Sequence, residues 1–425
     1  MNINDFLEKI SGFVWGNGLI FLLLSTGLIY TLKLGFIQFR FIPCLIRSVR
    51  NSRKNSKGSG ISQLKTVCLA LGTAMGTGNI TGVASALAIG GPGAIFWMWV
   101  SAFFGMALVY SENYLAVTYR KPGECTGPMA YLRYGLGSRV LPIVFAILCL
   151  AAALGMGGMV QVSSFTDNLY QCCDVKPVIA AVIIFAAIFL VTKGGIGRIG
   201  SAAQALLPAV TIAYAAVSVL VIFRFRENII PSFREIFTDA FSFTSAAGGV
   251  SGFAVSKAVS AGIRRGIFSN EAGLGSSPIL HCASDDGSPS LQGMWSIFEV
   301  FFDTIICCTL TALVLLTSGG NENYSVAAAF GSILGDKTDL FLTAAMAVFA
   351  FCTIIGWYYC GESAFTYLFG TSKKKTFCLM FALFSALGAV LTLETVFALS
   401  DIFNGLMAIP NLLGLLLLFR KVQKE

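Results

Sequence analysis

Two short polar segments stand inside stretches of this chain that are otherwise apolar enough to cross a membrane. The first lies in LGTAMGTGNITGVASALAIGGPGAIFWMWV, residues 71–100, which holds seven glycines and one proline. The second is IFSNEAGLGSSPIL, residues 267–280. Gly and Pro disfavour a helix interior by about 1 and 3 kcal/mol relative to Ala, so each segment predicts a broken membrane helix. Unwound backbone inside a membrane must lie against protein or a water-filled cavity, which points to a binding site.

The two segments are related to each other. Asn79-x-x-Gly82 aligns with Asn270-x-x-Gly273, and an aromatic-rich apolar stretch follows each segment. An odd number of predicted spans, five, separates them, which inverts the second copy across the membrane. Paired broken helices in inverted halves are typical of binding sites in secondary transporters. Close helix packing through small residues such as Gly72 would explain one such segment, but a related pair favours a site.

The freed backbone groups of such a pair have opposite polarity. N–H groups at the start of one half-helix favour an anion, whereas carbonyl groups at the end of another favour a cation. A zwitterion, such as an amino acid, suits both poles at once.

Membrane helices must position these segments. The chain has 425 residues, of which 56% are hydrophobic and only 12% are charged, with a mean hydropathy of +0.78. Soluble proteins have about a quarter of charged residues, so we expect one all-α polytopic membrane domain and no separate soluble domain. About 11 transmembrane helices are predicted, at residues 17–34, 67–89, 93–117, 140–168, 177–192, 202–223, 249–281 (interrupted), 291–317, 339–368, 376–397 and 400–419.

The distribution of basic residues predicts the orientation in the membrane. Residues 33–65 hold eight Lys or Arg, and no acidic residue occurs between Glu8 and Glu112. Basic loops stay in the cytoplasm, so the N-terminus is expected outside the cell membrane and the C-terminal RKVQKE inside. The N-terminal MNINDFLEKISGFVW has no cleavage site and predicts an amphipathic helix at the interface. The net charge of +8 thus reflects topology and not nucleic-acid binding.

Motifs for other functions are weak. Most of the 12 cysteines lie in apolar spans, Cys172–Cys173 has no assigned role, and His281 is the single histidine. A histidine metal site needs three or four ligands, so none is expected. We find no nucleophile elbow or phosphate-binding loop, which argues against an enzyme or a pump. A passive channel or facilitator is the alternative, because broken helices also build selectivity filters.

The motifs GTGNITGVASALAIGGPGAIFWMW, RRGIFSNEAGLGSSPILHCAS, TIIGWYYCGE and LSDIFNGLMAIPNLLGLLLL resemble the alanine/glycine:cation symporter family, also called sodium:alanine symporters. The resemblance runs nearly end to end. It implies a leucine-transporter-type fold, with one extra N-terminal helix and two inverted five-helix repeats. Residues 1–62 would then precede the repeats 63–228 and 229–425. The family also implies uptake of alanine or glycine driven by sodium, or in some members by protons, with no other cofactor.

The resemblance further implies a substrate site built from both broken helices and two later ones. Backbone N–H groups near Gly78 and Asn79 would hold the carboxylate, and carbonyls near Phe268 and Ser269 would hold the ammonium group. Phe268 and Trp357 would cap the small side chain. The residues implied are Thr77, Gly78, Asn79, Gln161, Phe268, Ser269, Asn270, Glu271 and Trp357.

The fold implies a sodium site between the first broken helix and the helix that contains FAFCTIIGWYYCGE. Carbonyls of Gly72 and Met75 and the hydroxyl of Thr353 are the expected ligands. Cys352 stands where family members often have serine, and a thiol is a poor ligand for a hard cation. Proton coupling therefore stays open as the alternative. The sequence gives no signal for oligomeric state.

Carboxylates inside membrane spans are functional candidates by default. Glu271 is expected to partner an ion, a proton or the pair Arg264–Arg265, and these arginines alternatively form an outer gate. Asp303 is expected either to take part in coupling or to make a structural hydrogen bond. Three carboxylates near span ends are expected to reach the membrane surface: Glu112, Glu362 and Asp401.

Overall fold

The computed structural model describes residues 3–51, 61–121, 126–241, 257–285, 287–319 and 324–423. Their regular structure is helical, and Ile61 and Ser284 form an isolated backbone bridge. The helices are α1 (Ile3–Val14), α2 (Asn17–Lys33), α3 (Phe41–Asn51), α4 (Gln63–Ala74), α5 (Thr81–Gly90), α6 (Gly93–Tyr119), α7 (Gly127–Ala130), α8 (Leu141–Ala152), α9 (Gln161–Cys173), α10 (Pro177–Thr192), α11 (Gly195–Arg224), α12 (Ile229–Ala240), α13 (Lys257–Asn270), α14 (Ser277–His281), α15 (Pro289–Val300), α16 (Thr309–Thr317), α17 (Val326–Leu334), α18 (Thr338–Phe369), α19 (Lys374–Leu387) and α20 (Leu393–Leu417).

Two of the long helices contain a wider turn. The π-helical segment Ala153–Val160 joins α8 to α9, and Phe301–Cys308 joins α15 to α16. Such segments are rare and occur mostly at functional sites. Both lie at mid-helix, where they turn Gln161 and Asp303 towards the centre of the bundle.

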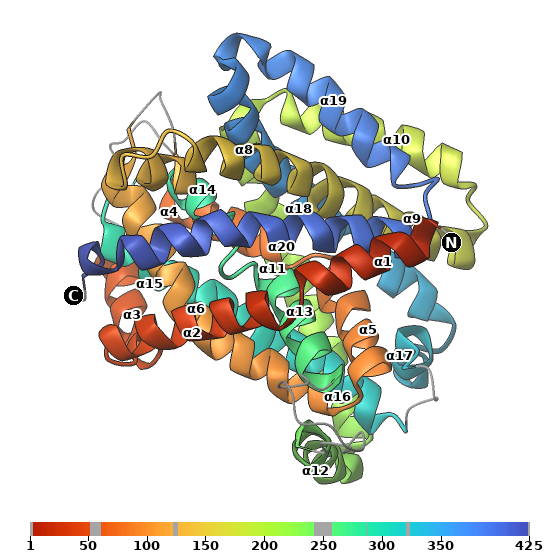
Figure 1. Ribbon diagram of the computed structural model, residues 1–425. Coiled ribbons are helices and arrows are strands. Elements are labelled where there is room, and N and C mark those ends of the chain that lie inside the picture. The colour runs from red at the N-terminus through yellow and green to blue at the C-terminus, as the bar shows by residue number, and fades with distance from the viewer. Residues whose placement is uncertain are drawn as a thin grey trace.

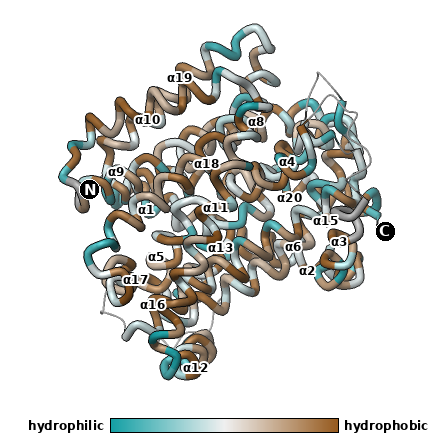
Figure 2. Tube along the Cα trace, turned by 180° about the vertical axis from the view of Figure 1, so that it is seen from behind, coloured by the Kyte–Doolittle hydropathy of each residue, from teal (hydrophilic) through white to brown (hydrophobic). Residues whose placement is uncertain are grey.

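Within the described residues, seven helical stretches are long and apolar enough to cross a membrane, judged by length and composition. The helices α5 and α10 are shorter apolar helices. In Figure 2 hydrophobic colour follows the helices, while hydrophilic colour gathers mainly at their ends. The polytopic helical character is therefore confirmed, and the number of about 11 spans stays a prediction.

Both predicted helix breaks are present. The first broken helix consists of α4 and α5, joined through the short 3-10 turn Thr77–Asn79. The second consists of α13 and α14, and between them Glu271 has a φ of 58° and Gly273 and Gly275 have φ of 84° and 85°. Glycine adopts this left-handed backbone without strain, which explains why two glycines stand in the second break.

Other helices enclose the breaks. α6 packs along both α13 and α5, and α4 packs against α11 and α18. Figure 1 shows α18 and α20 running through the middle of the bundle, α10 and α19 side by side at one edge, and the two termini at opposite ends. We call the end with the N-terminus the N face and the end with the C-terminus the C face.

The last two predicted spans are wrong in their boundaries. We expected 376–397 and 400–419, but α19 ends at Leu387 and α20 begins at Leu393. The side chain of Thr392 caps α20 by accepting a hydrogen bond from the Thr395 amide at 3.4 Å. Apolar residues continue through this turn, so hydropathy alone hides the boundary. The start of the predicted span 249–281 lies outside the described residues up to residue 256.

Candidate functional site

The first break is fastened to α9 by a glutamine. Gln161 Oε1 accepts hydrogen bonds from both the amide and the hydroxyl of Thr77, each at 3.0 Å. The Asn79 amide donates to the Gly76 carbonyl within the 3-10 turn. The sequence predicted that this amide would face a substrate carboxylate, whereas here it is engaged inside the turn. Thr77, Asn79 and Gln161 do come together as predicted.

Asp303 connects the two breaks. Its Oδ1 accepts from Asn79 Nδ2 at 2.6 Å, and its Oδ2 accepts from Ser269 Oγ at 2.7 Å and from Thr304 Oγ1 at 2.9 Å. The carboxyl group is fully buried. Asn79 Oδ1 is also buried, without a hydrogen-bond partner among the described residues. This carboxylate joins the two breaks, and its part in coupling stays a prediction.

The second break is held from α18. Glu271 Oε1 accepts from Trp357 Nε1 at 2.8 Å, and its Oε2 accepts from the Ser276 hydroxyl. Asn270 donates to Thr304 Oγ1 at 3.1 Å and accepts from the Ala272 amide at 3.0 Å. Glu271 and Trp357 thus fix the unwound turn.

The two aromatic residues that we expected to cap the substrate side chain lie in different places. A Cβ added to Gly78 would lie 3.2 Å from the Phe268 ring, so this ring covers the first break as expected. Trp357 is fully buried, and it packs so closely on Gly157 that a Cβ there would lie 2.2 Å from Trp357 Cβ. Phe268 therefore bounds the cradle, while Trp357 acts mainly through Glu271.

The residues of the expected sodium site also come together. Thr353 Oγ1 donates to the Gly72 carbonyl at 3.0 Å. A Cβ on Gly76 would lie 2.7 Å from the same hydroxyl, and a Cβ on Gly72 would lie 3.1 Å from Cys352 Cβ. Met75 ends α4 with a non-helical ψ of 75°. The close approach of α4 to α18 gathers carbonyl and hydroxyl oxygens, the ligands that hard cations prefer.

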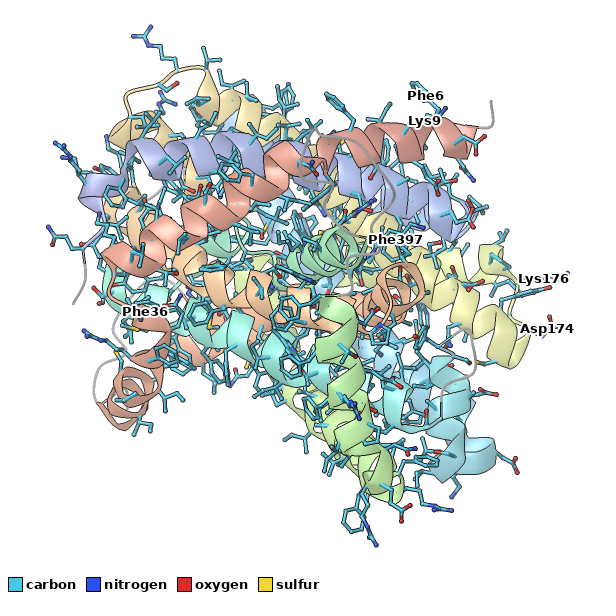
Figure 3. All side chains as sticks on the ribbon, turned by 60° about the horizontal axis from the view of Figure 1, so that its bottom comes forward. Phe6, Lys9, Phe36, Asp174, Lys176 and Phe397 are labelled. Carbon is cyan, nitrogen blue, oxygen red and sulfur yellow. The ribbon has the colours of Figure 1, made fainter. Side chains whose placement is uncertain are left out.

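An ion pair lies at the N face. Arg264 bonds to Asp401 and to Ser11, and Arg265 Nη1 lies 3.6 Å from the same carboxylate. The Phe397 ring packs at a tilt against Phe268 with ring centroids 5.4 Å apart, and in the view of Figure 3 Phe397 lies nearer the middle of the molecule than Asp174 and Lys176, which stand at its edge. A hollow of about 500 Å³ lies over these residues, with Glu8, Thr81, Ser85 and Glu394 also on its walls.

The expectation that Glu112 and Asp401 reach the membrane surface is wrong. Both are fully buried. Asn411 donates to Glu112, and the partner of the two arginines is Asp401 and not Glu271. Proximity to a predicted span end does not reveal such partners, because they come from helices far apart in the sequence. Glu362 is also largely buried, and it bonds at 2.7 Å to Lys374, whose side chain is exposed.

A polar cluster that the sequence did not predict closes the C face. His281 Nε2 lies 2.8 Å from Glu299 Oε1, and its Nδ1 lies 2.7 Å from Gln292 Oε1. Gln292 in turn donates to Gln63 Oε1 at 2.6 Å. The Ile61 amide donates to the Ala283 carbonyl at 3.0 Å beside it. The single histidine therefore joins hydrogen bonds between α14, α15 and α4.

Two broken helices that meet at a buried carboxylate are typical of the binding sites of secondary transporters. A crystal structure of MhsT in complex with L-phenylalanine superposes with a TM-score of 0.64 at 13% sequence identity, covering 84% of this chain and 89% of that one. This similarity shows the fold alone. It confirms the predicted leucine-transporter-type, all-α architecture.

Sequence comparison then defines the family. Residues 1–425 match the sodium:alanine symporter family. The chain is 38% identical to the sodium/alanine symporter AgcS of Methanococcus maripaludis, over 100% of this chain and 97% of that one. It is 33% identical to the probable sodium/glutamine symporter GlnT of Bacillus subtilis, over 99% and 90%. The chain belongs to the sodium:alanine symporter family and is a secondary active symporter of amino acids.

Proposed function

We propose that this symporter couples the uptake of alanine or glycine to an inward sodium gradient by alternating access. The observation that carries the proposal is the buried Asp303 carboxylate, whose hydrogen bonds from Asn79, Ser269 and Thr304 all come from neutral groups. A buried carboxylate is costly unless a cation or a proton accompanies it. Sodium, or the ammonium group of the substrate, meets this requirement where the two breaks converge.

The side-chain oxygen of Asn79, which accepts no hydrogen bond from the described residues, supports the same proposal. Asn79 Oδ1 is buried beside Asp303 without a hydrogen-bond partner among the described residues. A side-chain amide oxygen accepts two hydrogen bonds and is a suitable ligand for a hard cation. Asn79, Ser269 and Asp303 together would therefore supply several oxygens to one bound cation.

The carbonyls of Gly72 and Met75 and the hydroxyl of Thr353 are our proposed sodium ligands between α4 and α18. Thr353 already points its hydroxyl at the Gly72 carbonyl, so sodium would replace the hydroxyl proton as the partner of that oxygen. Cys352 adds no good ligand, which leaves the neighbouring backbone to complete the coordination. The free N–H and carbonyl groups of the two breaks would hold the substrate carboxylate and ammonium group.

The cradle favours a small substrate. The Phe268 ring lies over Gly78, and Phe397 lies behind it. A steric wall separates substrates that differ by one methylene by only about 1–3 kcal/mol, so alanine and glycine are both proposed. Glutamine belongs in the same competition assay, because GlnT is described as a sodium/glutamine symporter.

We also propose the arrangement in the membrane. Residues 63–228 and 229–425 form the two inverted repeats, after the N-terminal residues 1–62. The basic segment 33–65 begins at the end of α2, and its helix α3 lies at the C face, so the C face lies in the cytoplasm and the N face outside the cell membrane. The hollow above Phe397 is then the outer entrance, and Arg264, Arg265 and Asp401 form the gate beneath it.

Uptake of labelled alanine into proteoliposomes of the pure protein tests the proposal. We expect accumulation above equilibrium with an inward sodium gradient alone. Accumulation with a proton gradient alone would overturn sodium coupling and assign Asp303 or Glu271 to a proton. Equilibration without accumulation under every gradient would identify a facilitator and overturn the symport mechanism.

Two matched glycine variants test the site itself. Gly76→Ala should lower the initial rate of uptake about tenfold, because overpacking costs about 1–3 kcal/mol. Its methyl group would lie 2.7 Å from Thr353 Oγ1 and 2.8 Å from Gln161 Oε1. Gly82→Ala, with no heavy atom within 4 Å of the added Cβ, should transport normally. Equal rates for both variants, at equal amounts of folded protein, would show that Gly76 does not belong to the site.

A further inference from the structure

An apolar cavity opens on the side of the bundle, away from the substrate site. Its volume is about 560 Å³. The walls come from the segment that follows α2, from α6, and from the π-helical segment Phe301–Cys308. Among the residues that line it are Phe39, Ile42, Trp99, Val100 and Phe301. The lining is almost entirely hydrocarbon, with Gln38 the one amide side chain on it.

The mouth of the cavity combines apolar and basic groups. Phe39 and Ile42 are 74% and 53% exposed, and Arg40 between them is exposed as well. The amphipathic helix α3 begins at Phe41, directly after this arginine. Residues 33–65 contain eight Lys or Arg and no acidic residue. A basic segment at the membrane surface attracts anionic lipid headgroups, while the hollow beside it accepts hydrocarbon.

The inner wall of the cavity belongs to the segment that carries Asp303. Phe301 and Ile305 line the cavity, and Phe41 stacks on Phe301 with ring centroids 5.4 Å apart. On the same turn, Asp303 points inward to Asn79 and Ser269. Trp99 Nε1 donates to Thr309 Oγ1 at 2.8 Å, just beyond the turn. One π-helical segment therefore separates the cavity from the site.

We propose that this cavity binds an acyl chain of an anionic phospholipid, with the headgroup beside Arg40. The bound chain packs against Phe301 and Ile305 and thereby holds the π-helical segment in the arrangement that presents Asp303 to the two breaks. Binding of the lipid stands independently of the transported substrate. The effect on transport rests on the proposed function, because it acts through Asp303.

Quenching of Trp99 fluorescence by brominated lipids tests the binding. The protein is placed in phosphatidylcholine nanodiscs with increasing fractions of phosphatidylglycerol or phosphatidylcholine brominated on the acyl chain. The difference between wild type and Trp99→Phe isolates the Trp99 signal. We expect half-maximal quenching at about a fivefold lower fraction of brominated phosphatidylglycerol than of brominated phosphatidylcholine. Equal fractions for the two lipids would overturn the proposed preference.

Two pairs of variants separate the headgroup from the chain. Arg40→Gln should abolish the preference for phosphatidylglycerol, while Lys375→Gln, which removes an exposed positive charge from the first turn of α19, should keep it. Val100→Phe fills the cavity and should raise the half-maximal fraction for both lipids. Val182→Phe, at a residue of α10 that is 64% exposed, should leave the half-maximal fraction unchanged for both lipids. Quenching unchanged by Val100→Phe would place the lipid elsewhere.

The effect on transport has its own measurement. In phosphatidylglycerol liposomes, half-maximal alanine uptake should need about fivefold less sodium than in phosphatidylcholine liposomes, and Val100→Phe should remove this difference. Equal sodium dependence in both lipids would overturn the link to Asp303. Absence of sodium-driven uptake in either lipid would contradict the proposed function, and the quenching results would still decide whether the lipid binds.

Discussion

The two faces of the bundle are closed by different means. At the N face, the closing contacts that we describe are between side chains: the pair Arg264–Asp401 and the ring of Phe397 against Phe268, with a hollow of about 500 Å³ above them. At the C face, Ile61 makes backbone hydrogen bonds to Ala283 and Asp285. The side-chain cluster of His281 reinforces these bonds.

The difference indicates which face opens more readily. Side chains change rotamer without moving the backbone, whereas separating α4 from α14 and α15 breaks the backbone hydrogen bonds of Ile61 and the Gln63–Gln292 contact. Ligand binding shifts the populations of such states by its different affinity for each. We therefore expect the N face to open first to admit substrate, and the C face to open only once the occupied site has drawn the breaks together.

The largest effect is expected from removing a contact that helps to close the C face. His281→Ala leaves the Glu299 carboxyl buried without its partner, which costs about 3–5 kcal/mol. Loss of closure there should abolish accumulation of alanine while exchange across the membrane continues. Both rates are measured in proteoliposomes, with thermal unfolding in detergent to confirm a folded protein.

A double variant provides the control. Replacing both groups, in His281→Leu with Glu299→Leu, removes the orphaned carboxyl and should recover thermal stability but not accumulation, because the link from α14 to α15 is still absent. Full accumulation in the folded His281→Ala variant would mean that the backbone bonds of Ile61 alone keep the C face closed.

A smaller effect is expected at the N face. Asp401→Asn weakens the charged hydrogen bond to Arg264, worth about 1.5–3 kcal/mol, while Arg264 keeps its contact with Ser11. A cysteine introduced beneath this closure as Gly78→Cys, under the Phe268 ring, should then react about tenfold faster with a charged thiol reagent.

The matched control removes another carboxylate from the same hollow. Glu394→Gln lies on the wall and should leave the reaction rate of the introduced cysteine unchanged. If Asp401→Asn and Glu394→Gln accelerate the reaction equally, the negative charge of the hollow controls access of the reagent, and the Arg264–Asp401 ion pair does not. The proposed difference between the two faces would then be wrong.

Local signals in the sequence predicted the features of the site that depend on the backbone. The glycines revealed both breaks, and the residues Asn79, Ser269 and Gln161, which the resemblance implied for the substrate site, lie in or beside them. The aligned residues Asn79 and Asn270 differ in their place: Asn79 lies within the first break, whereas Asn270 ends α13 and the second break follows it. The φ of 84° and 85° at Gly273 and Gly275 explains this difference, because these glycines are the residues that unwind the chain.

Contacts between distant helices could not be predicted. Asp401 lies 137 residues from Arg264, and no local sequence pattern in either segment predicts that the two residues meet. The same holds for Glu112 and Asn411, which are 299 residues apart. Hydropathy predicts that a carboxylate near a span end reaches the surface, but burial of these groups depends on partners that only the folded bundle supplies. An acidic residue within an apolar span remains the signal that such a partner exists.

The smallest effect is expected between the two faces, at the proposed sodium site. Cys352→Ser places a hydroxyl, a better ligand for a hard cation than a thiol, beside Gly72 and Thr353. We expect half-maximal uptake at about two- to fivefold less sodium, about 0.5–1 kcal/mol, with the same preference among alanine, glycine and glutamine. Cys378→Ser, on α19 and bonded to Thr192, is the control and should leave sodium dependence unchanged. If the two variants behave alike, residue 352 does not contact the ion, and the oxygens around Asp303 become the better candidates for the coupling site.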